Sequence, residues 1–580
     1  MNLFADIREL VVASLTSLAE AGSLPADLDF GNVAVEPPRD AAHGDMATNA
    51  AMALAKPAKM KPRDIAGLLA PLLEADDRVV GADIAGPGFI NLRLDPAIWL
   101  TVIAEALAKG ADFGRSESNG KRVNVEYVSA NPTGPLHVGH TRGAVFGDAL
   151  AGLLDFTGWD VTREYYINDG GAQVDVLARS AHLRYLEAHG RPITIADGLY
   201  PGDYLVPVGE ALKAKFGTSL LEAEEDEWLP VIREFATDAM MDLIRKDLKS
   251  LGVEMDVFYS EKSLYGGGTI EASIESLKSK GLIYRGYLEP PKGKKPEGWE
   301  PREQTLFRST DYGDDVDRPI QKSDGAWTYF APDIAYHFDK VERGFDLLID
   351  IFGADHGGYV KRMKAAVAAL SDEKTPLEIK LTQLVKLYKN GEEFKMSKRA
   401  NNFVTLADLI DEVGSDVTRF TMLTRKNDAP LDFDFDKALE QSKDNPVFYV
   451  QYANARICSV LRTAQEGGIS TDDGALGQVD LSGLNHEAWV ELAQKIAEWP
   501  RLVETAALHH EPHRIAFYLY DLAGVFHALW NKGRDVNELR FLQDDDTAGA
   551  PARMAAIRAV SVVISAGLGI LGVTPATEMR

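Results

Sequence analysis

Alternating apolar and polar positions predict a β-strand at residues 121–128, KRVNVEYV. A short turn rich in Pro and Gly follows, and a helix with apolar side chains at four-residue spacing begins near His137. A second strand, DVTREYYI, is expected at residues 160–167. This order of strand, helix and strand predicts a β-α-β unit of a doubly wound parallel sheet, and therefore an α/β fold.

The first part of the chain mixes helical and strand patterns. Residues 5–22 carry apolar side chains at helical spacing and end at a glycine. Short strands are expected at residues 32–38 and 88–94, with helices at residues 47–56 and 62–75 between them. These patterns predict a small α+β module.

The length of 580 residues requires several domains, because one hydrophobic core does not grow to this size. We assign the α+β module to residues 1–115 and the doubly wound domain to residues 116–385. Within the second domain, an acidic and then Pro- and Lys-rich stretch at about 186–310 is expected to be a connective insertion. Residues 386–440 contain a basic polar loop, and helical patterns dominate residues 441–580.

Cysteine content and apolar runs restrict the compartment. The single cysteine, Cys458, excludes an internal disulfide and a Cys-rich zinc site, which fits a reducing environment. Charged residues interrupt the N-terminal apolar pattern, unlike a signal peptide. The longest apolar run, residues 559–573, is too short to span a bilayer and is expected to form a buried terminal helix. We expect a cytoplasmic protein with no membrane role and no protein-bound zinc.

The net charge of −26 is unfavourable for nucleic-acid binding, which usually requires a basic surface. A large acidic protein can still carry local basic strips. Three such strips are found at residues 292–295, 360–364 and 395–399. Solvated surface is the alternative interpretation of each strip.

The sequence HVGH at residues 137–140 falls where the first predicted strand ends and the helix begins. Ligands bind at this point of a doubly wound sheet, and the helix N-terminus offers unpaired N–H donors to an anion. His137 and His140 share one face of the first turn, and Gly139 lets a ligand approach the backbone. This arrangement suits a nucleoside triphosphate. Metal binding by the two histidines is the weaker alternative, because no cysteine or carboxylate cluster lies nearby.

A second motif, KMSKR at residues 395–399, follows a predicted strand or hairpin and precedes a predicted helix. Alone it would be interpreted as a basic surface loop. Together with HVGH it occurs in the order, and at the ends, that a split nucleotide-binding fold requires. Coincidence is therefore the poorer explanation.

The two motifs resemble the HIGH and KMSKS signatures of class I aminoacyl-tRNA synthetases. The resemblance implies catalytic roles for His137, His140, Lys395 and Lys398, with the lysines on the triphosphate. The sequence GADH at residues 353–356 is similar to the ribose-binding turn of the class. The implied ATP-binding residues are Pro135, His137, Gly139, His140, Gly353, Asp355, His356, Met396, Ser397 and Lys398.

Longer segments resemble arginyl-tRNA synthetases of the bacterial type, nearly from end to end. They include VNVEYVSANPTGPLHVGHTRGAVFGD, YYINDGGAQ, TYFAPDIAYH, GADHGGYVKR and NPVFYVQYANAR. A guanidinium is a planar fork of donors that buried carboxylates select over the ammonium of lysine. The arginine-binding residues implied by the resemblance are Glu126, Ser129, Asn131, Tyr329 and Asp333, with Asn131 on the α-amino group.

Spacing alone favours ordinary structural roles for these residues. Glu126 could be a solvated strand position, Asp333 a helix cap and Tyr329 a core aromatic residue. The family resemblance reverses that preference.

The implied reaction uses ATP with Mg²⁺ as the substrate complex and proceeds through arginyl-AMP, with tRNA for arginine as the partner. The helical residues 441–580 are similar to an anticodon-binding domain, residues 386–440 to a stem-contact region and residues 1–115 to a tRNA-contacting module. Tyr449, Tyr452 and Arg456 are the candidate tRNA-binding residues, although aromatic residues on helices are more often core. We expect a monomer.

Two other function classes stay open on the sequence. The first is a different adenylate-forming enzyme, such as a glutamyl or cysteinyl synthetase or a pantothenate-synthetase-like ligase. The second is a noncatalytic tRNA-binding protein that retains the fold. The presence of both motifs counts against this class, because such a protein has no need of both.

Overall fold

The computed structural model describes residues 2–579 except 39, 289–302, 395–403, 544, 545 and 547. The chain forms two compact units. One unit comprises residues 1–116, 442–569 and 574–580, and the other comprises residues 117–441 and 570–573.

The second unit is built on a five-stranded sheet with the order β12-β11-β5-β6-β7. All neighbouring strands in it are parallel. Its strands are β5 (Arg122–Glu126), β6 (Asp160–Ile167), β7 (Val257–Ser260), β11 (Leu347–Gly353) and β12 (Leu377–Thr382). The predicted doubly wound α/β fold is therefore confirmed.

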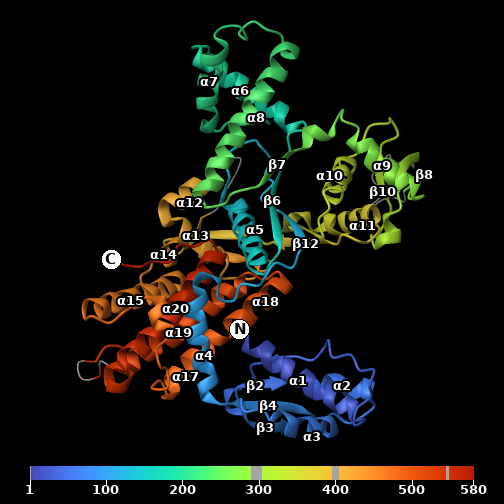
Figure 1. Cartoon of the computed structure of the whole chain (residues 1–580). Helices are drawn as coiled ribbons and strands as arrows, with labels where there is room; N and C mark the ends of the chain where they lie inside the picture. Colours follow the sequence, from blue (N-terminus) through green and yellow to red (C-terminus); the bar gives the residue numbers. More distant parts are fainter. Residues whose placement is uncertain are drawn as a thin grey trace. The chain divides into compact units, whose positions relative to one another are not determined.

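Helices cover the sheet and connect its strands (Figure 1). The predicted helix after the first strand is α5 (Val138–Phe156), whose side chains are largely buried. Helix α10 (Phe330–Glu342) and helix α11 (Val360–Ser371) pack with β11 in one apolar core. Parallel strands need such crossovers. Helix α5 begins at the carboxyl end of β5, where a ligand is expected, and helix α10 ends before the start of β11.

The stretch predicted as an insertion is more ordered than its sequence suggests. Helices α6 (Gln173–Ala188), α7 (Val206–Phe216) and α8 (Glu225–Ser250) enclose a core of their own, around Trp228 and Tyr185. Strand β7 lies within the predicted range of 186–310 but belongs to the main sheet. Helix α9 (Thr269–Ser279) then precedes a small antiparallel sheet of β8 (Ile283–Tyr287), β9 (Glu303–Phe307) and β10 (Arg318–Gln321).

The region after the main sheet begins with the predicted hairpin. Strand β13 (Val385–Lys389) pairs antiparallel with β14 (Glu392–Phe394) and parallel with β15 (Leu431–Asp434). Between β14 and β15 the described chain forms α12 (Leu406–Val413) and α13 (Ser415–Met422), and the short α14 (Phe435–Ala438) follows β15.

The first unit contains the predicted N-terminal module. Its sheet has the order β1-β2-β4-β3. The elements of the module are α1 (Leu3–Glu20), β1 (Val35–Glu36), β2 (Met46–Thr48), α2 (Ala50–Ala58), α3 (Pro62–Leu73), β3 (Val79–Ala85), β4 (Phe89–Leu94) and α4 (Pro96–Lys109). The predicted strands and helices of this module are confirmed, with shifts of a few residues at their ends.

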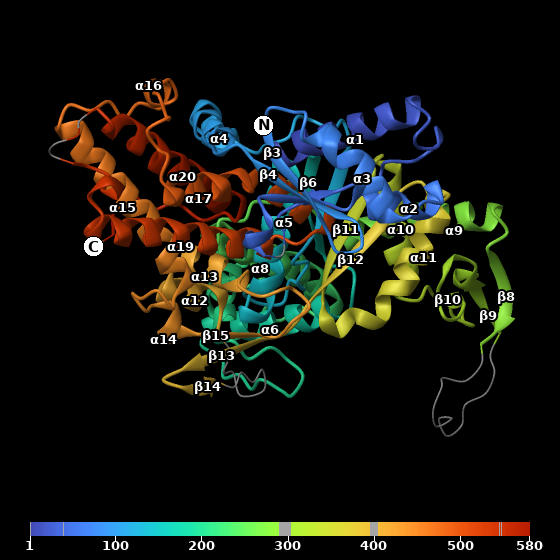
Figure 2. The same ribbon diagram turned by 90° about the horizontal axis from the view of Figure 1, so that it is seen from below.

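The rest of the first unit is helical, as predicted. Its helices are α15 (Pro446–Glu466), α16 (Asp473–Leu476), α17 (Glu487–Ala497), α18 (Trp499–His509), α19 (His513–Asp535) and α20 (Ala550–Ile570). Figures 1 and 2 both show α17, α19 and α20 side by side.

The terminal apolar helix is longer than the sequence pattern indicates. In the described part of the chain, α20 is the one helix that is long and apolar enough to cross a membrane. However, 83% of its most apolar window is buried inside the protein, so the predicted buried helix is confirmed and its predicted length is too short. Small residues such as Ala550 extend the apolar pattern toward the N-terminal end.

Candidate active site

The HVGH motif forms the turn that begins α5. His137 has extended backbone angles and caps the helix: its Nδ1 accepts a hydrogen bond from the Gly139 N–H at 3.1 Å. The His137 N–H in turn donates to His140 Nδ1 at 3.3 Å, and the two rings stack with centroids 3.8 Å apart. Because Nδ1 of each ring accepts a hydrogen bond, the neutral ring carries its proton on Nε2. Two imidazoles are thereby fixed at a helix N-terminus, which favours an anion.

Glycine is required in this turn for a steric reason. A Cβ on Gly139 would lie 2.9 Å from His137 Cε1 and 3.0 Å from its Nδ1. A side chain there would displace the His137 ring from its capping position.

Residues next to the second motif pair with the HVGH turn. The Val138 N–H donates to the Val404 carbonyl at 3.2 Å, and the Leu406 N–H donates to the Leu136 carbonyl at 2.8 Å. The motif residues Lys395, Met396, Ser397 and Lys398 lie outside the described residues. The chain that leaves the second motif is therefore attached beside the first.

Buried Arg142 of α5 holds the segments that precede β13 and β15, a role that the sequence patterns did not predict. Its guanidinium donates to the carbonyls of Gln383, Lys426 and Ala429 at 3.1, 2.8 and 2.7 Å. Burial lowers the Arg142 pKa to about 10, which leaves the side chain charged at neutral pH. The sequence signal is the position of an arginine one turn into a helix whose other residues are mostly apolar.

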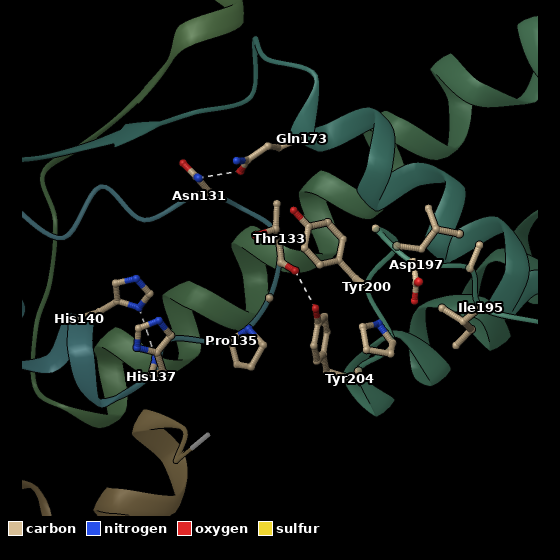
Figure 3. A pocket seen from close by; sticks show the side chains of 16 residues that line it. Asn131, Thr133, Pro135, His137, His140, Gln173, Ile195, Asp197, Tyr200 and Tyr204 are labelled. Carbon is tan, nitrogen blue, oxygen red and sulfur yellow. Dashed lines mark hydrogen bonds between the residues drawn. The ribbon is translucent and has the colours of Figure 1, made fainter. Parts of the chain in front are cut away.

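A cavity of about 1000 Å³ adjoins the HVGH turn. Its lining includes four predicted site residues: Asn131, Pro135, His137 and His140. Figure 3 shows the opposite wall, which comes from residues 195–204 of the insertion. A volume of this size accommodates a nucleotide.

The opposite wall contributes residues that the sequence analysis missed. The Tyr204 hydroxyl donates to the Thr133 carbonyl at 2.8 Å, and burial raises the Tyr204 pKa to about 12. Asn131 Nδ2 donates to Gln173 Oε1 at 2.7 Å (Figure 3). Tyr204 lies in no quoted motif and Gln173 ends the segment YYINDGGAQ, so the fold brings both residues to the turn at residues 131–133.

The predicted arginine-binding residues lie at the end of β5 and the start of α10. Glu126 is 6% exposed and is thus not the solvated strand position that spacing favoured. Tyr329 immediately precedes α10 and is 87% exposed, which excludes a core role. Tyr329 is also the N-cap residue of α10, so Asp333 is not the cap. All three alternative interpretations are therefore wrong.

Asp333 is a carboxylate without a matching cation. The Tyr359 hydroxyl donates to Asp333 Oδ2, but no lysine or arginine forms an ion pair with Asp333 in the described part of the chain. Burial, together with the nearby Glu261 and Glu126 carboxylates, raises the Asp333 pKa to about 7. A cation placed here would reverse that shift.

The GADH sequence lies at the carboxyl end of β11, the strand next to β5. The side chains of Asp355 and His356 are exposed and stand 3.6 Å apart at Oδ2 and Nε2. A Cβ on Gly353 would lie 2.5 Å from Asp355 Oδ1, so the small residue leaves room for that carboxylate. Asp355 is thus available at the same sheet edge as HVGH.

In the described residues, no group of three or more His, Cys, Asp or Glu side chains could hold a metal ion.

Family comparisons cover nearly the whole chain. Residues 102–441 match the catalytic domain of class I (R) tRNA synthetases, and residues 5–94 match the arginyl tRNA synthetase N-terminal domain. The chain belongs to the arginyl-tRNA synthetase family. Residues 450–579 match the DALR anticodon-binding domain.

Individual relatives agree with this family. The chain is 71% identical to an arginine–tRNA ligase of Roseobacter denitrificans and 69% identical to one of Paracoccus denitrificans, each over 100% of both chains. It resembles the structure of a putative arginyl-tRNA synthetase from Campylobacter jejuni, with 33% identity, a TM-score of 0.72 and coverage of 84% of this chain and 100% of the other. The Thermus thermophilus arginyl-tRNA synthetase shares the fold at 21% identity, with a TM-score of 0.72 and 100% coverage of both chains.

The predicted tRNA-binding residues of this family member lie together on α15. The Arg456 guanidinium donates to the Tyr452 hydroxyl at 2.8 Å and stacks over the Tyr452 and Trp530 rings at 4.1 and 4.9 Å. The Tyr449 ring lies 4.5 Å from that of His527. All three predicted residues are partly exposed, so each combines packing within the helical domain with a surface position.

Proposed function

We propose that the α/β domain binds MgATP at the HVGH turn and L-arginine between the end of β5 and the start of α10. The chain is an arginine–tRNA ligase, which activates arginine with ATP and transfers it to tRNA. The observation that carries the proposed arginine site is Asp333, a carboxylate beside other carboxylates and without a cation of its own. A guanidinium supplies the missing charge and several donors in one plane.

The placement of ATP is supported by the HVGH turn and its cavity. The N-terminus of α5 and the Nε2–H groups of His137 and His140 would offer donors to phosphate oxygens. Asp355, at the end of the next strand, would accept hydrogen bonds from the ribose hydroxyls. The remaining nucleotide contacts are proposed for Pro135, Gly139, Gly353, His356, Met396, Ser397 and Lys398.

Three groups of residues support the proposed arginine site. Asp333 and Glu126 provide negative charge for the guanidinium, and exposed Tyr329 immediately precedes α10. Ser129 and Asn131 belong to the turn that leads from β5 to HVGH, where the α-amino and carboxylate groups would face ATP.

The first chemical step forms arginyl-AMP. A carboxylate oxygen of arginine attacks the α-phosphorus of ATP, and the bond to the bridging oxygen breaks to release pyrophosphate. The negative charge that develops on the phosphates needs donors that are already in place. We propose that His137, His140, Lys395 and Lys398 supply them.

The second step transfers the arginyl group. A ribose hydroxyl of the terminal adenosine of tRNA attacks the arginyl carbonyl carbon, loses its proton and forms an ester, while the bond from that carbon to the AMP phosphate oxygen breaks. We propose that Tyr449, Tyr452 and Arg456 contact the anticodon arm, that the N-terminal module contacts another part of the tRNA, and that the enzyme acts as a cytoplasmic monomer.

Aminoacylation with each of the twenty amino acids tests this function. The purified chain, MgATP and total tRNA should give charging of arginine alone, and reactions without ATP serve as the control. Preferential charging of another amino acid would overturn the proposed arginine site.

A further inference from the structure

Three buried carboxylates form a row across the sheet beneath the proposed arginine site. In the strand register, Glu126 of β5 lies beside Asp350 of β11 on one side and Glu164 of β6 on the other. Residues in register on parallel strands point to the same face. Asp350 and Glu164 are 0% exposed and Glu126 is 6% exposed. Such a row requires compensating cations.

Helix α10 and the residue that caps its C-terminus supply two cations to this row. Arg343 neutralises Glu164 with two hydrogen bonds of 2.7 and 2.8 Å. The Lys340 ammonium bridges the other two carboxylates, at 2.6 Å from Glu126 Oε2 and 2.9 Å from Asp350 Oδ1. Lys340 is 0% exposed, so it has no direct access to a substrate. It is a cation shared by two anions.

The Glu126 carboxylate also holds the turn that follows β5. Its Oε1 accepts a hydrogen bond from Ser129 Oγ at 2.9 Å, and Ser129 Oγ accepts one from the Tyr166 N–H at 3.1 Å. Val128 and Ser129 have positive φ angles of 72° and 39°. A β-branched residue rarely adopts this conformation, so surrounding bonds must maintain it.

We propose that Lys340 is a positioning residue for arginine activation: it fixes the orientation of Glu126 and, through Ser129, the turn that presents Asn131 and HVGH. Lys340 acts through these groups and touches no substrate. This inference rests on the arginine site proposed above. The titratable and charged groups around Lys340 and Glu126 are Asp333, Tyr336 and His337 of α10, its C-cap Arg343, Asp350 of β11, and Glu164 and Tyr166 of β6.

A matched pair of variants separates positioning from simple stability. Asp350→Asn removes one carboxylate but leaves the Lys340 ammonium on Glu126. Lys340→Met with Asp350→Asn removes the same carboxylate and also the cation. Both full-length proteins are compared by thermal unfolding and by aminoacylation, with the KM for arginine and the KM for ATP measured at about pH 6 and about pH 8.5.

Asp350→Asn should change the KM for arginine by less than about twofold, whereas the double variant should raise it by at least about tenfold with the KM for ATP unchanged. The double variant should also lose more arginine affinity at the lower pH than Asp350→Asn does, because a Glu126 charge that Lys340 no longer offsets raises the pKa of Asp333 further. Equal KM values and equal pH profiles for the two variants would overturn the proposal, whatever their melting temperatures.

If the double variant does not fold, Lys340→Gln with Asp350→Asn replaces it, because glutamine keeps a donor for Glu126 but no charge. The same arginine-specific and pH-dependent loss supports the proposal, and a profile identical to that of Asp350→Asn overturns it. Failure of the arginine site itself would show separately, as an unchanged KM for arginine in Asp333→Asn.

Discussion

The Tyr359 hydroxyl donates a hydrogen bond to Asp333 Oδ2, and this neutral group is the partner that the structure gives Asp333 in place of a cation. Burial is the largest cause of the raised pKa of Asp333, about 7, and the Tyr359 hydrogen bond opposes it. The free site therefore holds a proton on Asp333 in part of the population at neutral pH. Arginine must displace that proton in order to bind.

Arginine binding should therefore weaken as the pH falls below about 7. In the free protein, the ionised form of Asp333 predominates only above its raised pKa of about 7. A bound guanidinium lowers that pKa, so binding releases a proton near neutral pH. The KM for arginine, measured between about pH 5.5 and pH 8.5, should fall as the pH rises, and calorimetry in buffers of different ionisation enthalpy should detect proton release.

Asp333→Asn should abolish this pH dependence and reduce kcat/KM for arginine by about 100-fold or more, as expected for the loss of one partner in a buried ion pair. Tyr359→Phe is the matched variant. It keeps the carboxylate but removes the opposing hydrogen bond, so the pH midpoint should move to higher pH. If the pH midpoint for arginine binding stays the same in Tyr359→Phe, Asp333 does not cause the pH dependence.

Local sequence patterns predicted the elements that carry the motifs, and the predicted strand at residues 160–167 matches β6. The buried network was not predictable in the same way. Lys340 ends the sequence YHFDK, which suggests a solvated helix face, and its partner Glu126 is 214 residues away. Strand β7 was missed because its four residues lie within a stretch dominated by helices. Patterns along the chain report local periodicity, whereas these features depend on which distant strands become neighbours.

Lys398→Ala should reduce the rate of adenylate formation by orders of magnitude and leave the free energy of unfolding nearly unchanged, because the residue is proposed to act on phosphate charge. Single-turnover formation of arginyl-AMP and denaturant unfolding measure the two quantities. Exposed Lys386 of β13 provides the control, and Lys386→Ala should match the unsubstituted enzyme. A Lys398→Ala enzyme with near-full rate would remove this lysine from the mechanism.

Arg419 should be a major source of stability in the unit that contains the α/β domain. Its guanidinium is fully buried and donates to the carbonyls of Leu571 and Leu251 at 2.8 and 3.0 Å and to Asp148 Oδ2 at 2.5 Å. Arg419→Met would leave the Asp148 charge and two carbonyls without this donor, at a cost of about 3–5 kcal/mol. Urea unfolding followed by tryptophan fluorescence tests this cost.

Arg425→Met is the control for that substitution, because Arg425 is exposed on the surface of the same unit. Its unfolding midpoint should differ little from that of the parent enzyme. Equal losses in the two variants would mean that the Arg419 contacts contribute nothing specific.

The helical domain should lose stability in acid through His527. Burial lowers the His527 pKa to about 4, below the ordinary value of 6.5. Its Nε2–H donates to the Tyr449 carbonyl at 3.2 Å, and its Nδ1 accepts from Arg456 at 3.3 Å, so the folded domain holds the neutral ring. The unfolded chain takes up a proton below pH 6.5, which the folded chain resists until about pH 4. Stability should therefore fall as the pH drops through this window, by about 1–3 kcal/mol from this residue. His527→Gln keeps a donor and an acceptor but cannot titrate, so its melting temperature should fall less between these pH values than that of the parent enzyme.

Exposed His509 supplies the control, because His509→Gln should retain the full acid sensitivity of the parent enzyme. Identical pH profiles of melting temperature for His527→Gln and the parent enzyme would show that His527 does not cause the loss of stability in acid.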